Sequence, residues 1–373
     1  MNEQNFCHEC ERPINPEDGH MFDGALLCDD CFHALTAECD CCGTRIWRED
    51  SEGNESIVLC QRCWDDRYTT CEECGTLIPN DEAWYEDGGD FPYCYECFNR
   101  KRNRPIKQYN YKPEPIFYGA DSDLYMGVEL EIDRGGEDKE NAQQILDVAN
   151  CGGERIYCKH DGSLSCDGGF EIVSHPMSLG YHREKMNWKE IFDEAISLSY
   201  LSHCTETCGL HIHVNRDAFG EYIVDQEACI SRIVFFVEKH WDDLVRFSRR
   251  KLSNLNRWAS RYATISPTAQ ETYKKAKDSH AGRYVAVNLS NEETIEFRLF
   301  RGTLRYETFI ATLQLVHFIC ELARSLSDRD FEVMSWRDFV LKVDADKMPE
   351  LVSYLKVRRL YVNEPADAES EEV

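Results

Sequence analysis

Hydrophobic and polar residues alternate in one C-terminal segment, residues 294–302. Read as a strand, this segment places Ile295, Phe297 and Leu299 on one face. Glu296 and Arg298 then fall on the opposite face. The same pattern recurs in three earlier segments, residues 127–133, 169–173 and 209–215. We therefore expect four strands of one sheet, with one hydrophobic face toward the core and one charged face.

The charged face of this sheet would gather seven side chains, namely Glu129, Glu131, Glu171, His211, His213, Glu296 and Arg298. Four carboxylates held close together at low effective dielectric repel one another strongly unless cations lie between them. Hard divalent ions such as Mg²⁺, bridged by a nucleotide phosphate, suit such a set of ligands. The pattern predicts a metal and nucleotide site on this face.

Other segments repeat hydrophobic residues at helical spacing. This spacing predicts helices over residues 138–150, 181–200, 225–250 with Asp225 as N-cap, 306–324, 335–343 and 348–360. Strands are predicted over residues 125–133, 156–159, 170–174, 283–289 and 294–300. The polar and basic stretch 251–279 is expected to form a mobile flap. The order of elements predicts an α+β domain built on a mostly antiparallel sheet with helices on one face.

The overall composition is that of a soluble globular protein, with 373 residues, 42% hydrophobic and 30% charged. This length suffices for two or three domains. The sequence contains no apolar run of about 18 residues or more and no signal-peptide pattern at its start. We expect a cytoplasmic protein with no membrane partner.

Cysteines dominate the N-terminal part, where 13 of the 20 lie before residue 98. The first cysteine of each group of four recurs with a period of 32 residues, at positions 7, 39 and 71. Pairs of the type Cys-x-x-Cys, separated by 17, 17 and 19 residues, suit tetrahedral zinc. The predicted ligands of three structural zinc ions are Cys7, Cys10, Cys28, Cys31, Cys39, Cys42, Cys60, Cys63, Cys71, Cys74, Cys94 and Cys97.

Local sequence around the cysteine pairs supports this zinc assignment. Gly43 and Gly75 follow the first pair of their units, where a metal-binding turn needs a positive φ. An aromatic residue follows each second pair, so that residues 7–98 resemble treble-clef and LIM-type zinc fingers. A disulfide scaffold would need a secretory context that the sequence lacks. We assign no role to Cys41, Cys204 or Cys208.

Charge is distributed unevenly along the chain, whose formal net charge is -27. Residues 1–100 hold 24 Asp or Glu against 6 Arg and no Lys, a formal charge of -18. This balance argues against nucleic acid and favours a basic protein or peptide as partner of the fingers. Packing inside the protein is an equally good role for them. We expect fingers over 1–99, a basic proline-containing linker over 100–120, a catalytic domain over 121–362 and a disordered acidic tail over 363–373.

Four motifs of the second domain occur in the order found in one enzyme family. They are Gly127-Val-Glu-Leu-Glu131, Asp161-Gly-Ser163 followed by Glu171-Ile-Val-Ser-His-Pro176, Gly209-Leu-His-Ile-His213, and Arg283-Tyr-x-Ala-x-Asn288 leading to Ile295-Glu-Phe-Arg298. Residues 124–325 therefore resemble the amidoligase family of the glutamine synthetase and glutamate-cysteine ligase superfamily. The resemblance implies a glutamine synthetase-like catalytic domain that joins a carboxylate to an amine, using ATP and Mg²⁺, through an acyl phosphate.

The resemblance also implies residue roles. Glu129, Glu131, Glu171 and Glu296 would hold Mg²⁺ together with His211. His213 would meet a phosphate or the bound carboxylate, while Arg298, Arg301 and Arg283 would clamp the γ-phosphate, because a guanidinium fork suits that task. The expected catalytic set is Glu129, Glu131, Glu171, His213, Glu296, Arg298 and Arg301.

Two other functions stay open at this point. A polar strand face is most often a solvated outer face, so the second domain of a zinc-finger adaptor could keep the fold without catalysis. The domain could also be a phosphotransferase that stops at a small phosphorylated acceptor. The sequence names neither the carboxylate nor the amine, which could belong to a peptide or protein.

Overall fold

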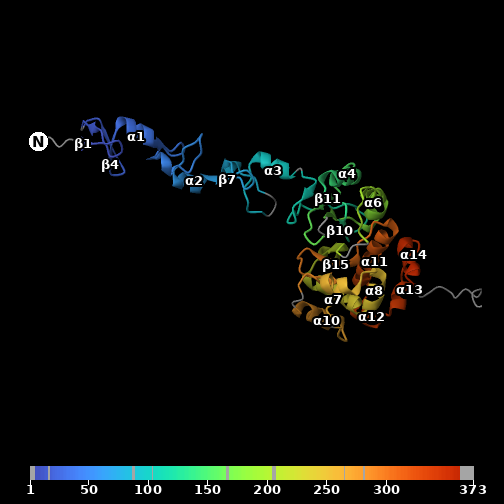
Figure 1. The fold of residues 1–373 in the computed structure, drawn as a ribbon. Helices are drawn as coiled ribbons and strands as arrows, with labels where there is room; N and C mark the ends of the chain where they lie inside the picture. Colours follow the sequence, from blue (N-terminus) through green and yellow to red (C-terminus); the bar gives the residue numbers. More distant parts are fainter. Residues whose placement is uncertain are drawn as a thin grey trace, which may run out of the picture. The chain divides into compact units, whose positions relative to one another are not determined.

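The computed structural model describes residues 5–15, 17–85, 89–102, 104–164, 168–203, 207–263, 265–279 and 282–361. The predicted tail over 363–373 and Cys204 lie outside these residues. Two compact units make up the chain, Met1–Asn103 and Arg104–Val373 (Figure 1). We describe each unit by itself.

The first unit repeats a small module of hairpin and short helix. Its elements are β1 (Asn5–Phe6), β2 (Pro13–Ile14), β3 (Gly19–Phe22), β4 (Ala25–Cys28), α1 (Asp29–Leu35), β5 (Thr36–Glu38), β6 (Arg45–Trp47), η1 (Arg48–Asp50), α2 (Gln61–Arg67), β7 (Tyr68–Thr70), β8 (Leu77–Pro79), η2 (Asn80–Glu82) and α3 (Tyr95–Arg102). Gly43 and Gly75 have φ of 73° and 71°, as the predicted metal-binding turns require. The buried cysteines form much of each small core, beside few apolar residues such as Leu27, Leu59 and Ile78.

The second unit is built on one seven-stranded sheet in the order β14-β15-β13-β10-β12-β11-β9. Its strands are β9 (Ile106–Lys107), β10 (Met126–Asp133), β11 (Ile156–Lys159), β12 (Gly169–Ser174), β13 (Gly209–Asn215), β14 (Val287–Asn288) and β15 (Thr294–Arg301). All neighbours pair antiparallel except β9 and β11, which are parallel. The predicted α+β architecture with a mostly antiparallel sheet is therefore confirmed.

Helices bury the hydrophobic face of this sheet. They are α4 (Lys139–Ala149), α5 (Leu179–Glu184), α6 (Trp188–Ser197), η3 (Arg216–Phe219), α7 (Ile223–Lys239), α8 (Trp241–Ser248), α9 (Leu252–Trp258), α10 (Ala269–Asp278), α11 (Tyr306–Ser325), α12 (Asp328–Val333), α13 (Trp336–Leu341) and α14 (Pro349–Val357). Most of α11 is buried, and Val128, Leu130 and Phe297 of the sheet are fully buried with it. Among the described residues, no helix combines the length and the apolar character that a membrane span needs.

Several predicted helices and strands differ from the structure. The single helix over 181–200 is two helices, α5 and α6, because Asn187 (φ -86°, ψ 49°) leaves helical geometry. The helix over 225–250 is α7 and α8, interrupted at His240 (φ -101°, ψ 28°). Asp225 is not its N-cap, since α7 begins at Ile223 and Asp225 lies in the first turn. Both breaks keep the apolar residues on the core side, so periodicity alone does not reveal them.

The stretch 251–279, expected as a mobile flap, instead contains two helices, α9 and α10. Thr272, Tyr273 and Ala276 of α10 are buried. The strand expected over 283–289 shrinks to β14, and Val285 instead forms an isolated parallel bridge with Ser260. Buried side chains of α10 therefore pack this stretch against the core of the second unit. Its polar composition does not predict this packing.

Candidate functional site

Strand register brings the predicted polar residues onto one face of the sheet. In antiparallel strands, directly opposed residues share a face. Glu131 lies opposite Glu171 and Glu129 lies opposite His211. His213 lies opposite Glu296. We call the assembled set Glu129, Glu131, Glu171, His211, His213, Glu296 and Arg298 the polar-face cluster.

His211 lies at the centre of the polar-face cluster and is only 4% exposed. Its Nδ1 atom is 3.5 Å from Glu129 Oε2 and 3.6 Å from Glu296 Oε1. Its Nε2 atom is 3.8 Å from Glu131 Oε1. One imidazole therefore faces three carboxylates that come from two neighbouring strands.

His213 forms a second group with Glu129 and Glu296. Its Nε2 atom is 3.3 Å from Glu129 Oε1 and 3.9 Å from Glu296 Oε1. Burial lowers the pKa of His213, but the charge of Glu129, its hydrogen bond and the charge of Glu296 together outweigh burial, and the pKa is raised. Burial likewise raises the pKa of Glu129, yet His213 and His211 hold it well below its ordinary value. The two histidines therefore favour the ionised form of Glu129.

The pKa values of two other carboxylates of the cluster, Glu131 and Glu171, shift in the opposite direction. Burial, and then the charge of nearby Glu129, raises the pKa of Glu171 well above its ordinary value. Burial also raises the pKa of Glu131, whose Oε2 accepts a hydrogen bond of 2.5 Å from the amide of Gly209. Such shifts are expected where carboxylates crowd together with too little positive charge between them.

The ligand atoms of the polar-face cluster fit two adjoining divalent ions. Glu129, Glu171 and His211 can each present one ligand atom within 4.8 Å of the others, and so can Glu129, His213 and Glu296. Glu129 belongs to both groups, so that its two oxygens could bridge two ions. The carboxylates suit Mg²⁺, whereas the imidazoles suit ions that accept nitrogen ligands, such as Mn²⁺, better than Mg²⁺.

The predicted arginines lie at different distances from these ligands. Arg298 pairs directly with Glu296 Oε1, and Asn288 Nδ2 donates to Glu296 Oε2 at 2.8 Å. Arg301 ends β15 opposite Gly209, at the end of the strand. Arg283 is exposed and donates to the hydroxyls of Tyr109 and Tyr284. The structure brings Arg298 into the cluster and leaves Arg283 at the edge of the sheet.

A β-bulge separates the arginines of β15. Leu210 pairs with Phe300 and Ile212 with Phe297, so His211 faces two residues of β15 instead of one. Strict alternation would place Arg301 on the hydrophobic face with Phe297. The bulge instead sets Arg301 opposite Gly209, which alternates with His211 on the polar face.

Two buried cations of the site were missed by sequence reasoning. Lys159 lies opposite Glu171, with its Nζ 3.9 Å from Glu171 Oε2. Arg250, 5% exposed, donates from Nη1 to the carbonyl of Arg298 at 2.7 Å, within the bulge. The strand alternation of 156–159 could have revealed Lys159. No local pattern marks Arg250, which was predicted as the last residue of the helix 225–250 and instead follows the end of α8 at Ser248.

The cysteine groups of the first unit fit zinc. Within each predicted group of four, the Sγ atoms lie within 4.8 Å of one another. Tetrahedral zinc with Zn–S bonds of about 2.3 Å requires S–S separations of about 3.8 Å. The measured separations include 3.7 Å for Cys10 and Cys28, 3.7 Å for Cys42 and Cys60, and 3.8 Å for Cys74 and Cys94. These three sites can therefore hold zinc.

Threonines of the metal-binding turns favour the thiolate form that zinc requires. Hydrogen bonds from Thr44 lower the pKa of Cys42 to about 6. Thr76 lowers the pKa of Cys74 in the same way, again to about 6. Cys41, the unassigned thiol, accepts a hydrogen bond from Arg67. Cys208 is buried beside the start of β13.

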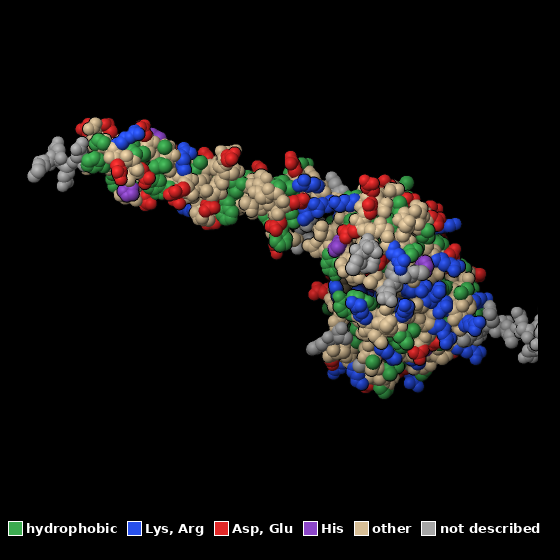
Figure 2. All heavy atoms as spheres, viewed as in Figure 1, with side chains coloured by type: hydrophobic (Ala, Val, Ile, Leu, Met, Phe, Trp, Pro, Cys, Tyr) green, Lys and Arg blue, Asp and Glu red, His purple; other side chains and the backbone are tan. Residues whose placement is uncertain are grey.

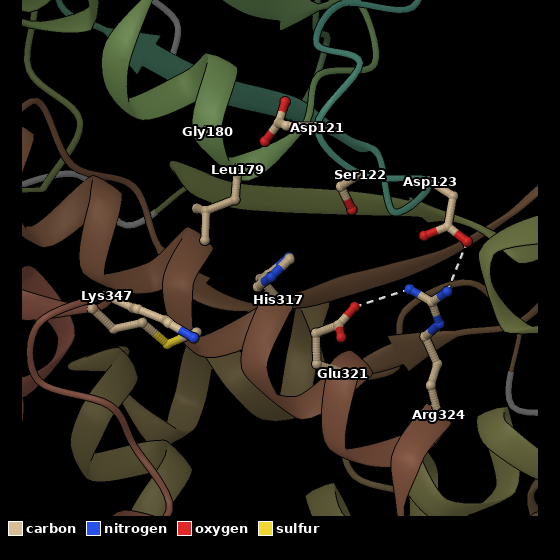
Figure 3. A pocket seen from close by; sticks show the side chains of 10 residues that line it. Asp121, Ser122, Asp123, Leu179, Gly180, His317, Glu321, Arg324 and Lys347 are labelled. Carbon is tan, nitrogen blue, oxygen red and sulfur yellow. Dashed lines mark hydrogen bonds and ion pairs between the residues drawn. The ribbon is translucent and has the colours of Figure 1, made fainter.

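A separate hollow of about 440 Å³ lies between the start of α5 and one face of α11 (Figure 3). His317, Glu321 and Arg324 of α11 line it, and Arg324 pairs with both Glu321 and Asp123. None of its lining residues belongs to the predicted site. The polar-face cluster, and not this hollow, unites the predicted chemistry.

Comparison with known proteins bears on the second unit. Residues 135–319 match a family model described as "Putative amidoligase enzyme". The match contains Glu171, His211, His213, Glu296 and the three predicted arginines, and it begins after Glu129 and Glu131. The predicted amidoligase resemblance is thus confirmed for this stretch, whereas placement in the glutamine synthetase superfamily stays a prediction.

Comparison with solved structures adds a distant likeness. One is titled "Crystal structure of a bifunctional glutathione synthetase from Pasteurella multocida", with 11% identity and a TM-score of 0.34. The alignment covers 65% of this chain and 45% of that chain. No curated protein matches the sequence.

Proposed function

We propose that the second unit is an ATP-dependent ligase that joins a carboxylate to an amine. The observation that carries this proposal is the sharing of Glu129 between two groups of metal ligands on the polar face of one sheet. The amidoligase match over residues 135–319 supports the reaction class. The catalytic set remains Glu129, Glu131, Glu171, His213, Glu296, Arg298 and Arg301, with His211 as a further ligand.

The reaction explains why cations and carboxylates lie together. A carboxylate is a poor acyl donor, so its oxygen first takes the γ-phosphoryl group of ATP, which releases ADP. The amine then attacks the carbonyl of the acyl phosphate, loses a proton and displaces phosphate. Bound Mg²⁺ or Mn²⁺ would neutralise the phosphate charge in the first step.

The residues of this chain would orient the reacting groups. Arg298 is held against Glu296, so its guanidinium is directed before ATP arrives, and such preorganised charge is effective in a buried site. Arg250 donates a hydrogen bond to the backbone carbonyl of Arg298 and so helps to hold this part of β15 in place. The carboxylates of the cluster could also receive the proton of the amine.

Release of ADP in the presence of hydroxylamine tests the proposal. Purified protein is incubated with ATP, Mg²⁺ or Mn²⁺, and pools of amino acids or peptides. Hydroxylamine captures an acyl phosphate as a hydroxamate, so ADP together with a hydroxamate is expected. A phosphorylated small acceptor without a hydroxamate would support a phosphotransferase, and absence of ATP binding would support an adaptor.

A variant pair links turnover to the polar-face cluster. Glu296→Gln keeps the size of the side chain and removes the charge, so ATP turnover should fall about 100-fold or more. The matched control is Glu292→Gln in the exposed turn before β15, which should retain full turnover. Equal turnover in both variants would refute the assignment of Glu296.

For the first unit, we propose recruitment of a basic protein or peptide that carries a substrate group. On the face shown in Figure 2, Asp and Glu are spread over the first unit, while Lys and Arg are abundant on the second. Attraction to a basic partner should weaken as salt rises, because exposed charges are screened. Binding of a Lys- and Arg-rich peptide, measured at low and high salt, tests this role.

A further inference from the structure

Aromatic rings and arginines form a continuous array at the edge of the sheet beside Arg298. The guanidinium of Arg298 lies 5.8 Å from the ring centre of Tyr284, and that of Arg283 lies 5.0 Å from the same ring. The rings of Trp258 and Tyr284 meet edge to face at 5.5 Å. Arg283 also donates to the hydroxyl of Tyr109 at 2.6 Å. We call Tyr109, Trp258, Arg283 and Tyr284 the aromatic array.

Backbone hydrogen bonds fix this array to the sheet. Ser260 donates its amide to the carbonyl of Tyr284 at 3.0 Å, and Ala286 donates to the carbonyl of Ser260 at 2.9 Å. The amide of Arg298 donates to the carbonyl of Ala286, also at 2.9 Å. Tyr284 therefore lies on the segment that leads into β14, and Trp258, the last residue of α9, lies just before the Ser260 segment bonded to it.

The array adjoins the polar-face cluster through Arg298, whose guanidinium lies 5.8 Å from the ring centre of Tyr284. Asn288 is bonded to Glu296 of the polar-face cluster. Ala286 is small and leaves Arg298 close to the ring of Tyr284. A ligand could therefore run from the metal ligands past Arg298 to the aromatic array.

The rings of the array are accessible although their neighbours are buried. Tyr284 is 39% exposed and Tyr109 is 51% exposed. Purine bases stack on aromatic side chains and on guanidinium planes, with a strength that depends little on sequence. The position of the rings next to Arg298, the predicted phosphate ligand, makes a base joined to phosphates a closer fit than a free aromatic molecule.

We propose that the aromatic array binds the purine base of ATP, while the triphosphate extends past Arg298 to the polar-face cluster. This inference rests on the proposed use of ATP. It also changes the expected role of Arg283, which contacts the base and not the γ-phosphate. Tyr109 lies between β9 and β10, and Arg283 joins it to the array by donating to its hydroxyl at 2.6 Å.

Binding of ATP and of inorganic tripolyphosphate to the full chain, each with Mn²⁺, tests this proposal by calorimetry. Tyr284→Ala and Trp258→Ala should each weaken ATP binding about 10-fold or more, since stacking contributes about 1–3 kcal/mol per base. Neither variant should change tripolyphosphate affinity. Tyr284→Phe keeps the ring and should keep most of the ATP affinity, which separates stacking from misfolding.

The controls distinguish failure of this inference from failure of the proposed function. Tyr222→Ala removes another exposed tyrosine, 65% exposed before α7, and should change neither affinity. Arg298→Ala should weaken ATP and tripolyphosphate alike. If ATP binds and Tyr284→Ala and Trp258→Ala retain its full affinity, the base site is wrong while ATP use stands. If the native protein binds neither ligand, both proposals are overturned.

Discussion

The two units of this protein place candidate metal ligands in opposite structural settings. In the first unit, buried cysteines such as Cys39 and Cys71 are themselves much of the small cores. In the second unit, the polar-face cluster lies on a finished sheet whose other face is backed by a large hydrophobic core. The first unit has soft sulfur ligands, and the second has mostly hard oxygen ligands.

The two units therefore differ in whether folding depends on metal binding. Small units with few apolar residues cannot offset the loss of chain entropy by burial alone, so metal binding supplies folding free energy. A sheet covered by a helix such as α11 does not have this need. We infer that metal creates the structure of the first unit, whereas structure creates the metal site of the second.

Zinc removal should produce the largest effect. Binding of structural zinc supplies about 10 kcal/mol or more to a finger, so a strong chelator should unfold residues of the first unit. Hydrogen exchange of amides in α2 should become fast, while amides of β10 stay protected. Cys63→Ser should have the same effect on its own module. If the amides of α2 stayed protected from exchange without zinc, the first unit would not need the metal to fold.

A large effect of a different kind is expected from a core residue of the second unit. Phe297 and Glu296 are neighbours in β15, yet Phe297 is fully buried in the core while Glu296 faces the metal ligands. Phe297→Ala should cost about 3–5 kcal/mol of stability. Glu296→Gln should cost about 1–3 kcal/mol, because the amide keeps only one of the two acceptor oxygens that Arg298 and Asn288 use. Urea unfolding of the second unit measures both, and equal costs would contradict the division of the two faces.

Much of this arrangement could be predicted from residue patterns. Alternation in 127–133 and 209–215 yields the strands that carry Glu129 and His211, because a strand with one buried face repeats every two residues. The cysteine pairs likewise repeat at regular spacing, and this spacing predicts the zinc sites of the first unit. Such signals are local, and each needs only a few consecutive residues.

What the sequence does not predict depends on contacts between distant segments. The β-bulge that turns Arg301 toward the polar face follows from the pairing of β13 and β15. The bridge between Val285 and Ser260 is equally non-local. Arg250 reaches the bulge from the end of α8, so no spacing in the chain connects it with Arg298.

Acid should destabilise the second unit through His182, independently of metal. Burial lowers the pKa of His182 to about 4, below its ordinary value of 6.5, because the ring is enclosed between Met126 and Trp188. As pH falls below 6.5, His182 becomes protonated in the unfolded chain, whereas in the folded chain it stays neutral until about pH 4. The stability that depends on neutral His182 is therefore fully present above pH 6.5 and decreases as pH falls toward 4. The loss between pH 7 and pH 5 is about 2 kcal/mol.

The His182 prediction is measured by urea unfolding of the second unit at pH 7 and pH 5. His182→Gln should lower stability at pH 7 but flatten the dependence on pH. His33→Gln, which changes an exposed histidine of the first unit, should leave that dependence unchanged. An equally steep dependence in His182→Gln would assign the acid sensitivity to other groups.

The smallest expected effect is that of metal on the stability of the second unit. An ion that binds only the folded state adds RT ln(1 + [L]/Kd), which is about 1.4 kcal/mol at ten times Kd. Mn²⁺ should therefore stabilise the second unit modestly, because its charge would offset the repulsion among Glu129, Glu171 and Glu296. Thermal unfolding with and without Mn²⁺ measures this gain, and Glu296→Gln should abolish most of it. If chelation instead unfolded the second unit as completely as the first, its fold would depend on metal too, and the contrast between the units would fail.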